Sequence, residues 1–343
     1  MNKNTLIKKY FQKNHLLKID NPQYKKIVDT LFNWLISCDH TENDLTAKFF
    51  DRKPMHASIR TKQDIVVAGI EEIEYLLKKY PEISFQKKVT DGEKIKKGGE
   101  IAIISGDNRT ILSLERTILN ILQRMSGIAT QTQKLTKIIT AENKPSTPNP
   151  QFLTHIASTR KTPWMLLDKK AVAAGGGLTH RLNLSDGILI KDNHLQILKN
   201  ENNLKNEEQT VTHALKMILP QITNTSIEIE VTTKEGANSA IKTFFHSHCH
   251  SREGGNPVNS NNTSLTIMLD NWTAKDVRNF IKEVNTNPYA SSIIFEASGN
   301  INESNLKHWA QTGVDIISSG ALTHSAKAAD LSLSVIQDQR EIK

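Results

Sequence analysis

Residues 265–284 of the chain read LTIMLDNWTAKDVRNFIKEV, and this stretch contains the two patterns that decide the fold. Its first part, Leu265–Asp270, is a short apolar run typical of a buried strand. Its second part, Thr273–Val284, has apolar residues at the spacing of an amphipathic helix. A strand followed directly by a helix is the unit from which parallel sheets are built.

The same unit recurs along the last two thirds of the chain. Helical patterns at Lys234–Phe244 and Glu303–Thr312 separate further apolar runs. This alternation predicts parallel strands joined by right-handed crossovers. With the opening stretch there are six candidate strands, fewer than the eight of a closed barrel, so we predict an open, incomplete α/β barrel. The other five strands are Phe152–Ser158, Ile188–Lys191, Ile227–Val231, Ser292–Ala297 and Val314–Ser318.

The first third of the chain has a different sequence pattern, which predicts a small α+β unit. Ile27, Leu31, Trp34 and Leu35 have helical spacing, and a second helix is expected over Asp64–Leu77. Short apolar runs separated by glycine-containing turns predict strands between residues 85 and 106.

A strong helix is expected over Thr110–Ser126, with Arg116 on its polar stripe and Gly127 as a candidate C-terminal stop. We divide the chain into an N-terminal domain of residues 1–115 and a barrel domain of residues 116–343, with a C-terminal helix packing back on the first domain. Ala141–Pro150 and His246–Ser264 have the polar composition of surface insertions, and we expect the second to be flexible.

Composition limits the classes of function. The chain has 343 residues, is 37% hydrophobic and carries a net charge of +8. This composition is typical of a globular protein with a basic charge balance. Its lysines are spread along the chain and do not form blocks of like charge, which favours a small anionic substrate over nucleic acid or a membrane surface. Cys38 and Cys249 form no Cys-x-x-Cys pair, and neither a signal peptide nor a membrane span is found, so we expect a cytoplasmic protein.

Polar residues gather where the predicted strands end, and the C-terminal ends of barrel strands converge on one face. Arg160, Lys161, Arg181 and Lys191, with His180, make a dense cationic cluster, and such a cluster calls for an anionic ligand. Arginine suits planar carboxylates, because its guanidinium binds them through two parallel hydrogen bonds.

The remaining strand ends predict the rest of the ligand. Backbone N–H groups in Ser298-Gly299 and Ser319-Gly320 can approach a phosphate closely. Glu230 and Asp270 supply hard oxygen atoms for Mg²⁺ or for ribose hydroxyls. Together these groups describe a ligand with carboxylates, a sugar, a phosphate and a metal-bound pyrophosphate.

An ordered set of motifs from about residue 85 to about residue 330 resembles the signature of the quinolinate phosphoribosyltransferase family. Each motif is weak by itself, but the ordered set is specific. The motifs are Glu115-Arg116-Thr117, Ser126-Gly127-Ile128-Ala129-Thr130, Thr159-Arg160-Lys161-Thr162, Gly175-Gly176-Gly177-Leu178-Thr179-His180-Arg181, Ile190-Lys191-Asp192-Asn193-His194, Ile229-Glu230-Val231, Met268-Leu269-Asp270-Asn271, Glu296-Ala297-Ser298-Gly299 and Gly320-Ala321-Leu322-Thr323-His324-Ser325.

The resemblance implies an N-terminal α/β sandwich domain, an open α/β barrel, and a homodimer or larger assembly in which subunits share active sites. The implied reaction joins quinolinate to phosphoribosyl pyrophosphate and releases carbon dioxide, with Mg²⁺ and without an organic cofactor. Lys161 would lie between the two substrates, and Glu230 and Asp270 would hold ribose and Mg²⁺. The quinolinate carboxylates would be bound by Arg160, His180, Arg181 and Lys191 with Arg116 of the other subunit, and the phosphate by Ser298, Gly299, Ser319, Gly320 and His324.

Two features depart from the family pattern, and two other functions compete. Asn300 stands where a second glycine is common, and asparagine tolerates left-handed backbone better than most residues. Pro163-Trp164-Met165-Leu166 replaces a Pro-Gly-Leu-Arg-like run. The alternatives are a non-decarboxylating phosphoribosyltransferase on the same fold and a catalytically silent anion-binding protein. His246, His248, Cys249 and His250 are too closely spaced for an ordinary tetrahedral zinc site.

Overall fold

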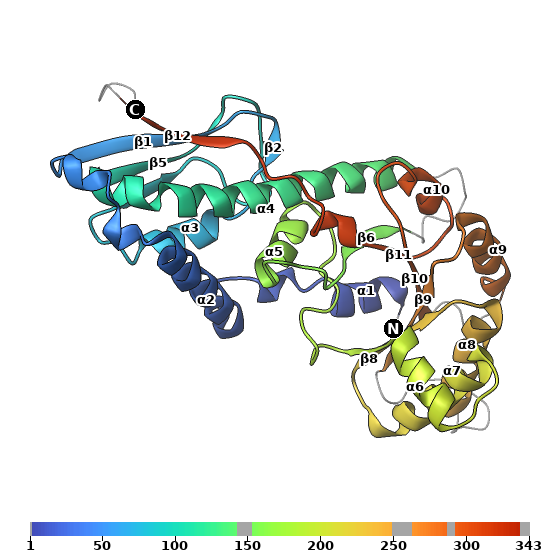
Figure 1. The fold of residues 1–343 in the computed structure, drawn as a ribbon. Helices are drawn as coiled ribbons and strands as arrows, with labels where there is room; N and C mark the ends of the chain where they lie inside the picture. The colour runs from blue at the N-terminus through green and yellow to red at the C-terminus, as the bar shows by residue number, and fades with distance from the viewer. Residues whose placement is uncertain (1, 143–152, 249–262, 287–291, 337–343) are drawn as a thin grey trace. The chain divides into compact units, whose positions relative to one another are not determined.

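The computed structural model describes residues 2–142, 153–248, 263–286 and 292–336, which form two compact units (Figure 1). The barrel unit comprises Met1–Gln12, Lys137–Thr159 and His180–Ser319. The sandwich unit comprises Lys13–Thr136, Arg160–Thr179 and Gly320–Lys343. The chain therefore passes between the units several times, whereas the sequence suggested a single division at residues 115 and 116.

All six predicted strands of the barrel unit are present in one parallel sheet. The order across the sheet is β6-β11-β10-β9-β8-β7, so β6 and β7 are its two edges and the barrel is open, as predicted. The strands are β6 (His155–Ser158), β7 (Ile188–Ile190), β8 (Ser226–Val231), β9 (Ser264–Asp270), β10 (Ile293–Ser298) and β11 (Ile316–Ser319).

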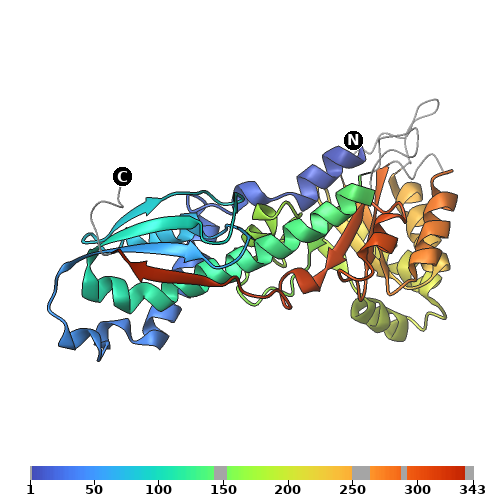
Figure 2. The same cartoon turned by 90° about the horizontal axis from the view of Figure 1, so that it is seen from above.

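Alternation along the strands separates two faces of this sheet. Ile227, Ile229 and Val231 of β8 are fully buried, and the side chains between them, Glu228 and Glu230, point to the opposite face. Helices lie outside the sheet in Figures 1 and 2, so the aliphatic face is covered and the carboxylates line the inside of the barrel. The helices are α6 (Asp192–Glu201), α7 (Glu207–Ile218), α8 (Lys234–His248), α9 (Ala274–Val284) and α10 (Leu306–Ala310).

The N-terminal helix α1 (Lys3–Phe11) belongs to the barrel unit and packs against β10 and β11. The ammonium group of Lys3, in α1, lies 2.9 Å from Asp315 Oδ2 and 5.1 Å from the centre of the Phe295 ring. Asp315 also accepts a hydrogen bond from the Phe295 backbone N–H at 2.8 Å. Asp315 is buried and Lys3 is partly buried, so a satisfied charge pair anchors α1 to the sheet.

The sandwich unit is built on a four-stranded antiparallel sheet in the order β12-β1-β5-β3, along which helix α4 runs (Figure 2). A two-stranded ladder of β2 and β4 lies beside it. The strands are β1 (Pro54–Thr61), β2 (Ile65–Val66), β3 (Ser84–Lys87), β4 (Lys94–Ile95), β5 (Glu100–Asp107) and β12 (Leu331–Val335), and the helices are α2 (Pro22–Asp39), α3 (Ile70–Leu77), α4 (Asn108–Glu142) and α5 (Leu166–Ala174).

Four expectations about this unit were wrong in detail. The helix expected over Thr110–Ser126 is α4, which continues through Gly127. A β-carbon at Gly127 would lie 2.1 Å from the Lys327 carbonyl oxygen, so this glycine permits close packing of a distant segment instead of ending the helix. In α2 the buried stripe is Tyr24, Val28 and Phe32, whereas Trp34 is 59% exposed.

The other two differences concern extended backbone where helix was expected. Only the second half of Asp64–Leu77 is helical, because residues 65–66 pair with β4 and Gly69, at φ 104°, begins α3. In place of a C-terminal helix, the described residues end in β12, which adds to β1 as an edge strand.

The two predicted insertions lie mostly outside the described residues. α4 and α8 extend to Glu142 and His248, so both helices run into segments that the composition assigned to loops. Ser264 begins β9, is 2% exposed and donates its backbone N–H to the Thr225 carbonyl at 3.1 Å. The rest of the expected insertion, residues 249–262 with Cys249 and His250, lies outside the described residues.

Candidate active site at the ends of the parallel strands

The predicted site residues fall into two groups, one in each unit. The barrel unit holds Lys191, Glu230, Asp270, Ser298, Gly299 and Ser319 at or beside the C-terminal ends of β7 to β11. It also holds His180 and Arg181, which precede β7 in the chain. The sandwich unit holds Arg116, Arg160, Lys161, Gly320 and His324. Arg160 follows β6 and Gly320 follows β11 directly in the chain, so both continue from strand ends of the barrel.

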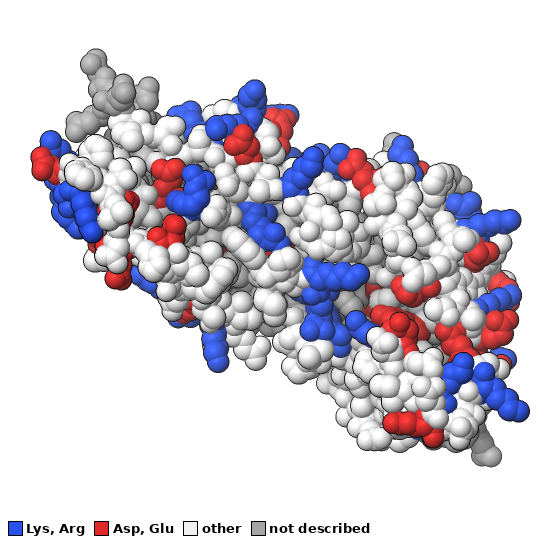
Figure 3. All heavy atoms as spheres, in the orientation of Figure 1, with Lys and Arg blue, Asp and Glu red and all other residues white. Residues whose placement is uncertain are grey.

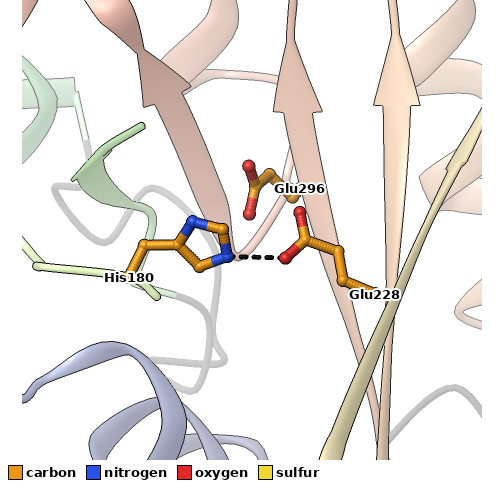
Figure 4. A group of neighbouring side chains, drawn as sticks. All are labelled: His180, Glu228 and Glu296. Atoms are coloured by element: carbon orange, nitrogen blue, oxygen red, sulfur yellow. Dashed lines mark hydrogen bonds and ion pairs between the residues drawn. The ribbon is translucent and has the colours of Figure 1, made fainter. Parts of the chain in front are cut away.

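Inside the barrel, His180 lies close to two glutamates, Glu228 on β8 and Glu296 on β10 (Figure 4). The His180 Nε2 atom lies 2.5 Å from Glu228 Oε2, and Glu296 on β10 points toward the same place. A ring nitrogen of His180 and one carboxylate oxygen from each glutamate all lie within 4.8 Å of one another. The exposed fractions are 8% for His180, 4% for Glu228 and 0% for Glu296, so the cluster is closed to solvent.

The face and backbone of His180 are held by the end of α1. The Phe11 ring stacks on the imidazole with 5.0 Å between ring centres and 17° between planes. The His180 backbone N–H donates to the Phe11 carbonyl at 3.0 Å, and His180 adopts a left-handed φ of 52°. A non-glycine residue in this conformation costs free energy, which these contacts and the Glu228 hydrogen bond offset.

Burial and repulsion from Glu228 raise the pKa of Glu296 to about 8, while the nearby His180 and Ser318 act in the opposite direction. Glu296 is therefore a neutral carboxylic acid at neutral pH, because a full second negative charge beside Glu228 would be costly in this dry environment. The neutral Glu296 then lies beside the hydrogen-bonded pair of His180 and Glu228, which fixes the orientation of the His180 ring.

We expect Glu296→Gln to remove a pH-dependent penalty on stability. Between the ordinary carboxyl pKa of 4.5 and about 8, the folded protein binds a proton that the unfolded chain has released, so wild-type stability falls as pH rises through this window. Glutamine cannot ionise and keeps the shape of the neutral acid. The melting temperature of the variant minus that of the wild type should therefore increase from about pH 5 to about pH 8. A difference that is flat over this range would show that Glu296 is ionised throughout.

A second pair of carboxylates lies at the mouth of the barrel. Burial raises the pKa of Glu230 to about 7; repulsion from Asp270 adds to this shift and attraction to Lys191 opposes it. The Asp192 backbone N–H at the start of α6 approaches Glu230 Oε2 at 3.5 Å. Two carboxylates that repel each other beside a lysine fit a site for a divalent cation or for sugar hydroxyls.

The turns after β9 and β10 interlock next to this pair. Asn271, which follows Asp270, donates its backbone N–H to the Ser298 carbonyl at 3.0 Å. A β-carbon at Gly299 would lie 2.3 Å from Asn271 Oδ1, and the φ of Gly299 is 100°, so glycine is required there. Asn300 has a left-handed φ of 51°, which confirms that asparagine can serve in this turn.

Arg181 and Ser319 are more enclosed than their predicted roles suggested. Arg181 is 8% exposed, and its Nη1 donates to the Gly187 carbonyl at 3.1 Å. Ser319 is 4% exposed and its hydroxyl donates to the Ile301 carbonyl at 2.8 Å. Ser319 is thereby fixed at the C-terminal end of β11, whereas Gly187 directly precedes β7, so Arg181 is bound near the N-terminal end of that strand. Lys191, at the C-terminal end of β7, is exposed.

In the sandwich unit, Lys161 lies beside Gly320 and His324. A β-carbon at Gly320 would lie 2.8 Å from the His324 ring and 3.0 Å from Lys161 Cδ. The Thr323 hydroxyl donates to the Lys161 carbonyl at 2.7 Å, which ties the two turns together. The fold thus brings Lys161, which follows β6, together with Gly320 and His324, which both follow β11.

Arg116 and Arg160 are exposed. Arg116 lies on the solvent side of α4, with its guanidinium 3.7 Å from Glu115 and its side chain 59% exposed. This exposure agrees with the predicted polar stripe and leaves the charge accessible to a ligand or a second chain. Glu228 and Glu296 were not among the predicted site residues, although their positions two residues before Glu230 and Ser298 place them on the same inner face.

Charges of both signs are interspersed over the face drawn in Figure 3. Among the helices of the described ranges, none has the length and hydropathy needed to cross a membrane. Cys38 is exposed and unpaired.

Comparisons with known proteins agree with one another. Two family models match in order: the quinolinate phosphoribosyl transferase N-terminal domain over residues 44–126 and the C-terminal domain over residues 128–334. A nicotinate-nucleotide pyrophosphorylase (carboxylating) of Bacillus subtilis, named as probable, is 34% identical over 340 residues, covering 96% of this chain and 97% of that one. A similarly named protein of Methanocaldococcus jannaschii is 34% identical over 285 residues, covering 82% and 87%.

A solved structure shares the fold. The nicotinate-nucleotide pyrophosphorylase of Francisella tularensis superposes with a TM-score of 0.72 at 30% identity, over 91% of this chain and 96% of that one. The match extends over both the sheet of the sandwich unit and the parallel sheet of the barrel unit, as its coverage requires.

Proposed function

The chain belongs to the quinolinate phosphoribosyltransferase family, and from this premise we propose which of its residues carry the reaction. The enzyme joins quinolinate to phosphoribosyl pyrophosphate and forms nicotinate mononucleotide, pyrophosphate and carbon dioxide, a step of NAD biosynthesis. The observation that supports the assignment most directly is the pairing of Glu230 and Asp270 beside Lys191 at the ends of neighbouring strands. The two carboxylates can bind a cation and sugar hydroxyls, and the neighbouring lysine can bind a carboxylate of the second substrate.

We assign quinolinate to the cationic residues. A dicarboxylate requires more than one positive charge, and guanidinium groups bind carboxylates through paired hydrogen bonds. Lys191 is exposed at the end of β7, while Glu228 and Phe11 set the orientation of His180. The proposed set is Arg160, His180, Arg181 and Lys191, completed by Arg116 from a second copy of the chain.

The phosphoribosyl group is assigned to the acidic pair and the two glycine turns. Backbone N–H groups in the Ser298-Gly299 and Ser319-Gly320 turns, with His324, suit the 5′-phosphate. Glu230 and Asp270 would bind the ribose hydroxyls and hold Mg²⁺, for which two mutually repelling carboxylates are fitting ligands. Bound Mg²⁺ would neutralise the charge of the leaving pyrophosphate.

The chain's own residues then account for the chemistry. The pyridine nitrogen of quinolinate attacks C1 of the ribose as pyrophosphate leaves, and positive charge develops on the sugar. Glu230 and Asp270 would stabilise that charge, because fixed carboxylates need no reorganisation as it forms. Lys161 would lie between the two substrates and hold their anionic groups together. The cationic nitrogen then stabilises the carbanion left when the 2-carboxylate departs as carbon dioxide, and a proton from solvent takes the place of the carboxylate at that carbon.

We further propose that the active form is a homodimer, or a larger assembly built from it, in the cytoplasm. The support is the exposed position of Arg116 on α4 together with the family resemblance. In such an arrangement Arg116 would enter the site of the other subunit. Two-fold symmetry would then give two equivalent shared sites per dimer.

The reaction is tested by supplying quinolinate labelled in its 2-carboxyl group together with phosphoribosyl pyrophosphate and Mg²⁺. We expect labelled carbon dioxide and nicotinate mononucleotide in equal amounts, and no turnover when chelator removes the metal. Nucleotide formed without labelled gas would favour a non-decarboxylating phosphoribosyltransferase. Binding of quinolinate without either product would favour a silent anion-binding protein.

A further inference from the structure

Arg124 of α4 lies among the elements that carry Lys161 and His324 and makes a two-point ion pair within the sandwich unit. Its Nε donates to Asp168 Oδ1 at 2.8 Å and its Nη2 to Asp168 Oδ2 at 2.7 Å. The Asp168 side chain on α5 is 0% exposed and that of Arg124 is 21% exposed. A buried pair with this fork geometry fixes α5 against α4 in one orientation.

The same two side chains reach the segment that follows Lys161. Asp168 Oδ2 accepts the Trp164 backbone N–H at 3.0 Å, and the Arg124 guanidinium lies 5.3 Å from the centre of the Trp164 ring. A planar guanidinium can stack on an aromatic face while it donates in its own plane, which an ammonium group cannot do. Residues 160–165 are thereby held at their C-terminal end.

Arg124 also reaches the segment that follows Gly320. Its Nη2 lies 3.4 Å from the Thr323 carbonyl oxygen. Thr323 is 0% exposed, and its hydroxyl donates to the Lys161 carbonyl at 2.7 Å. These hydrogen bonds form a closed network. Arg124 binds Asp168 and the Thr323 carbonyl. Asp168 binds the Trp164 backbone after Lys161, and the Thr323 hydroxyl binds the Lys161 carbonyl.

We propose that Arg124 is a positioning residue that fixes the turn bearing Lys161 against the turn bearing Gly320 and His324. The inference rests on the proposed function, which assigns Gly320 and His324 to the phosphate of phosphoribosyl pyrophosphate and places Lys161 between the two substrates. A β-carbon at Gly320 would lie 2.8 Å from the His324 ring and 3.0 Å from Lys161 Cδ, so the space between the turns leaves little tolerance for a shift. Small misplacements of binding groups cost large factors in rate.

A role limited to stability makes a different prediction. If the network only strengthened the fold, breaking it would lower the melting temperature and leave both Michaelis constants of the folded enzyme unchanged. If it positions the two turns, the KM for phosphoribosyl pyrophosphate rises more than the KM for quinolinate. Of the proposed quinolinate residues only Arg160 lies in these turns, whereas Lys191 and His180 are held by other contacts, within the barrel unit.

The test uses Arg124→Lys, Arg124→Met and Thr323→Val, with Thr323→Ser as the rescue variant. All are assayed well below their melting temperatures. We expect Arg124→Met to lower kcat/KM for phosphoribosyl pyrophosphate by roughly 30-fold and Arg124→Lys by about tenfold, with a smaller rise in the KM for quinolinate. Thr323→Val keeps the size of the side chain but loses the hydroxyl, and should cost about fivefold, which Thr323→Ser restores.

The double variant Arg124→Met, Thr323→Val should be less impaired than the product of the single effects, because both changes free the same pair of turns. If Arg124→Met does not fold, the Thr323 pair still decides the matter. Values of kcat/KM for phosphoribosyl pyrophosphate within about twofold of wild type in Arg124→Lys and Thr323→Val would overturn the inference. So would an equal rise of both Michaelis constants.

The wild-type enzyme separates this inference from the proposed function. Absence of labelled carbon dioxide from the wild type would count against the function itself. Normal release by the wild type, with unaffected Arg124 and Thr323 variants, would count against the positioning role alone.

Discussion

Lys161→Ala is expected to reduce turnover by about 10³-fold or more while leaving the fold intact, as expected when a charged group that acts on the transition state is removed. Lys161 is exposed, and what holds it in place is the hydrogen bond from Thr323 to its backbone carbonyl, which alanine keeps. Its side chain lies beside Gly320 and His324, where we place the phosphoribosyl group. The loss should therefore appear in turnover and not in the melting temperature.

Two controls sharpen this experiment. Lys216→Ala removes the same charge from an exposed position in the last turn of α7 and should leave turnover unchanged. Lys191→Ala, at the end of β7, should be as inactive as Lys161→Ala because it removes a proposed carboxylate ligand. A Lys161→Ala enzyme that retains wild-type turnover would remove this lysine from the site.

Mixing two inactive variants is expected to restore about a quarter of wild-type activity. Arg116→Ala and Arg160→Ala homodimers should each be nearly inactive, since each site would need Arg160 from its own chain and Arg116 from the other. After subunit exchange, half of the dimers are mixed, and one of the two sites in each mixed dimer has both arginines. Half of the dimers with half of their sites restored gives about a quarter of full activity.

The measurement requires proof of exchange, which mass spectrometry of the intact dimers supplies when one variant carries a tag. Confirmed mixed dimers without recovered activity would mean that Arg116 serves its own chain or no site at all. Recovery well above a quarter would mean that one of the single variants retains activity. Either outcome would remove the shared-site arrangement.

Several features of the fold could be predicted because they are recorded locally in the sequence. The six parallel strands were each found from a short apolar run, and the structure confirms all six in an open sheet. The alternation Ile227-Glu228-Ile229-Glu230 also predicts that the glutamates share one face. Periods of two and of 3.6 residues arise from backbone geometry, so they need no knowledge of distant neighbours.

Predictions about the ends of elements were less successful. Gly127 was taken as a helix stop, but it lies inside α4, where the approach of Lys327 leaves no room for a side chain. The C-terminal segment was expected to be helical and instead joins β1 as a strand. In both cases the deciding contact comes from a segment about 200 residues or more away along the chain, which no local pattern reports.

The sequence by itself determined the family, the reaction and the chemical types in the site, because an ordered set of motifs specifies which residues follow each strand. Only the tertiary structure decided their environments. It buried Glu296 beside Glu228, so that its pKa rises to about 8, and it placed Arg124 where two distant turns meet. The pKa of a carboxyl group and the partners of an arginine depend on desolvation and on through-space contacts, which exist only once the chain has folded.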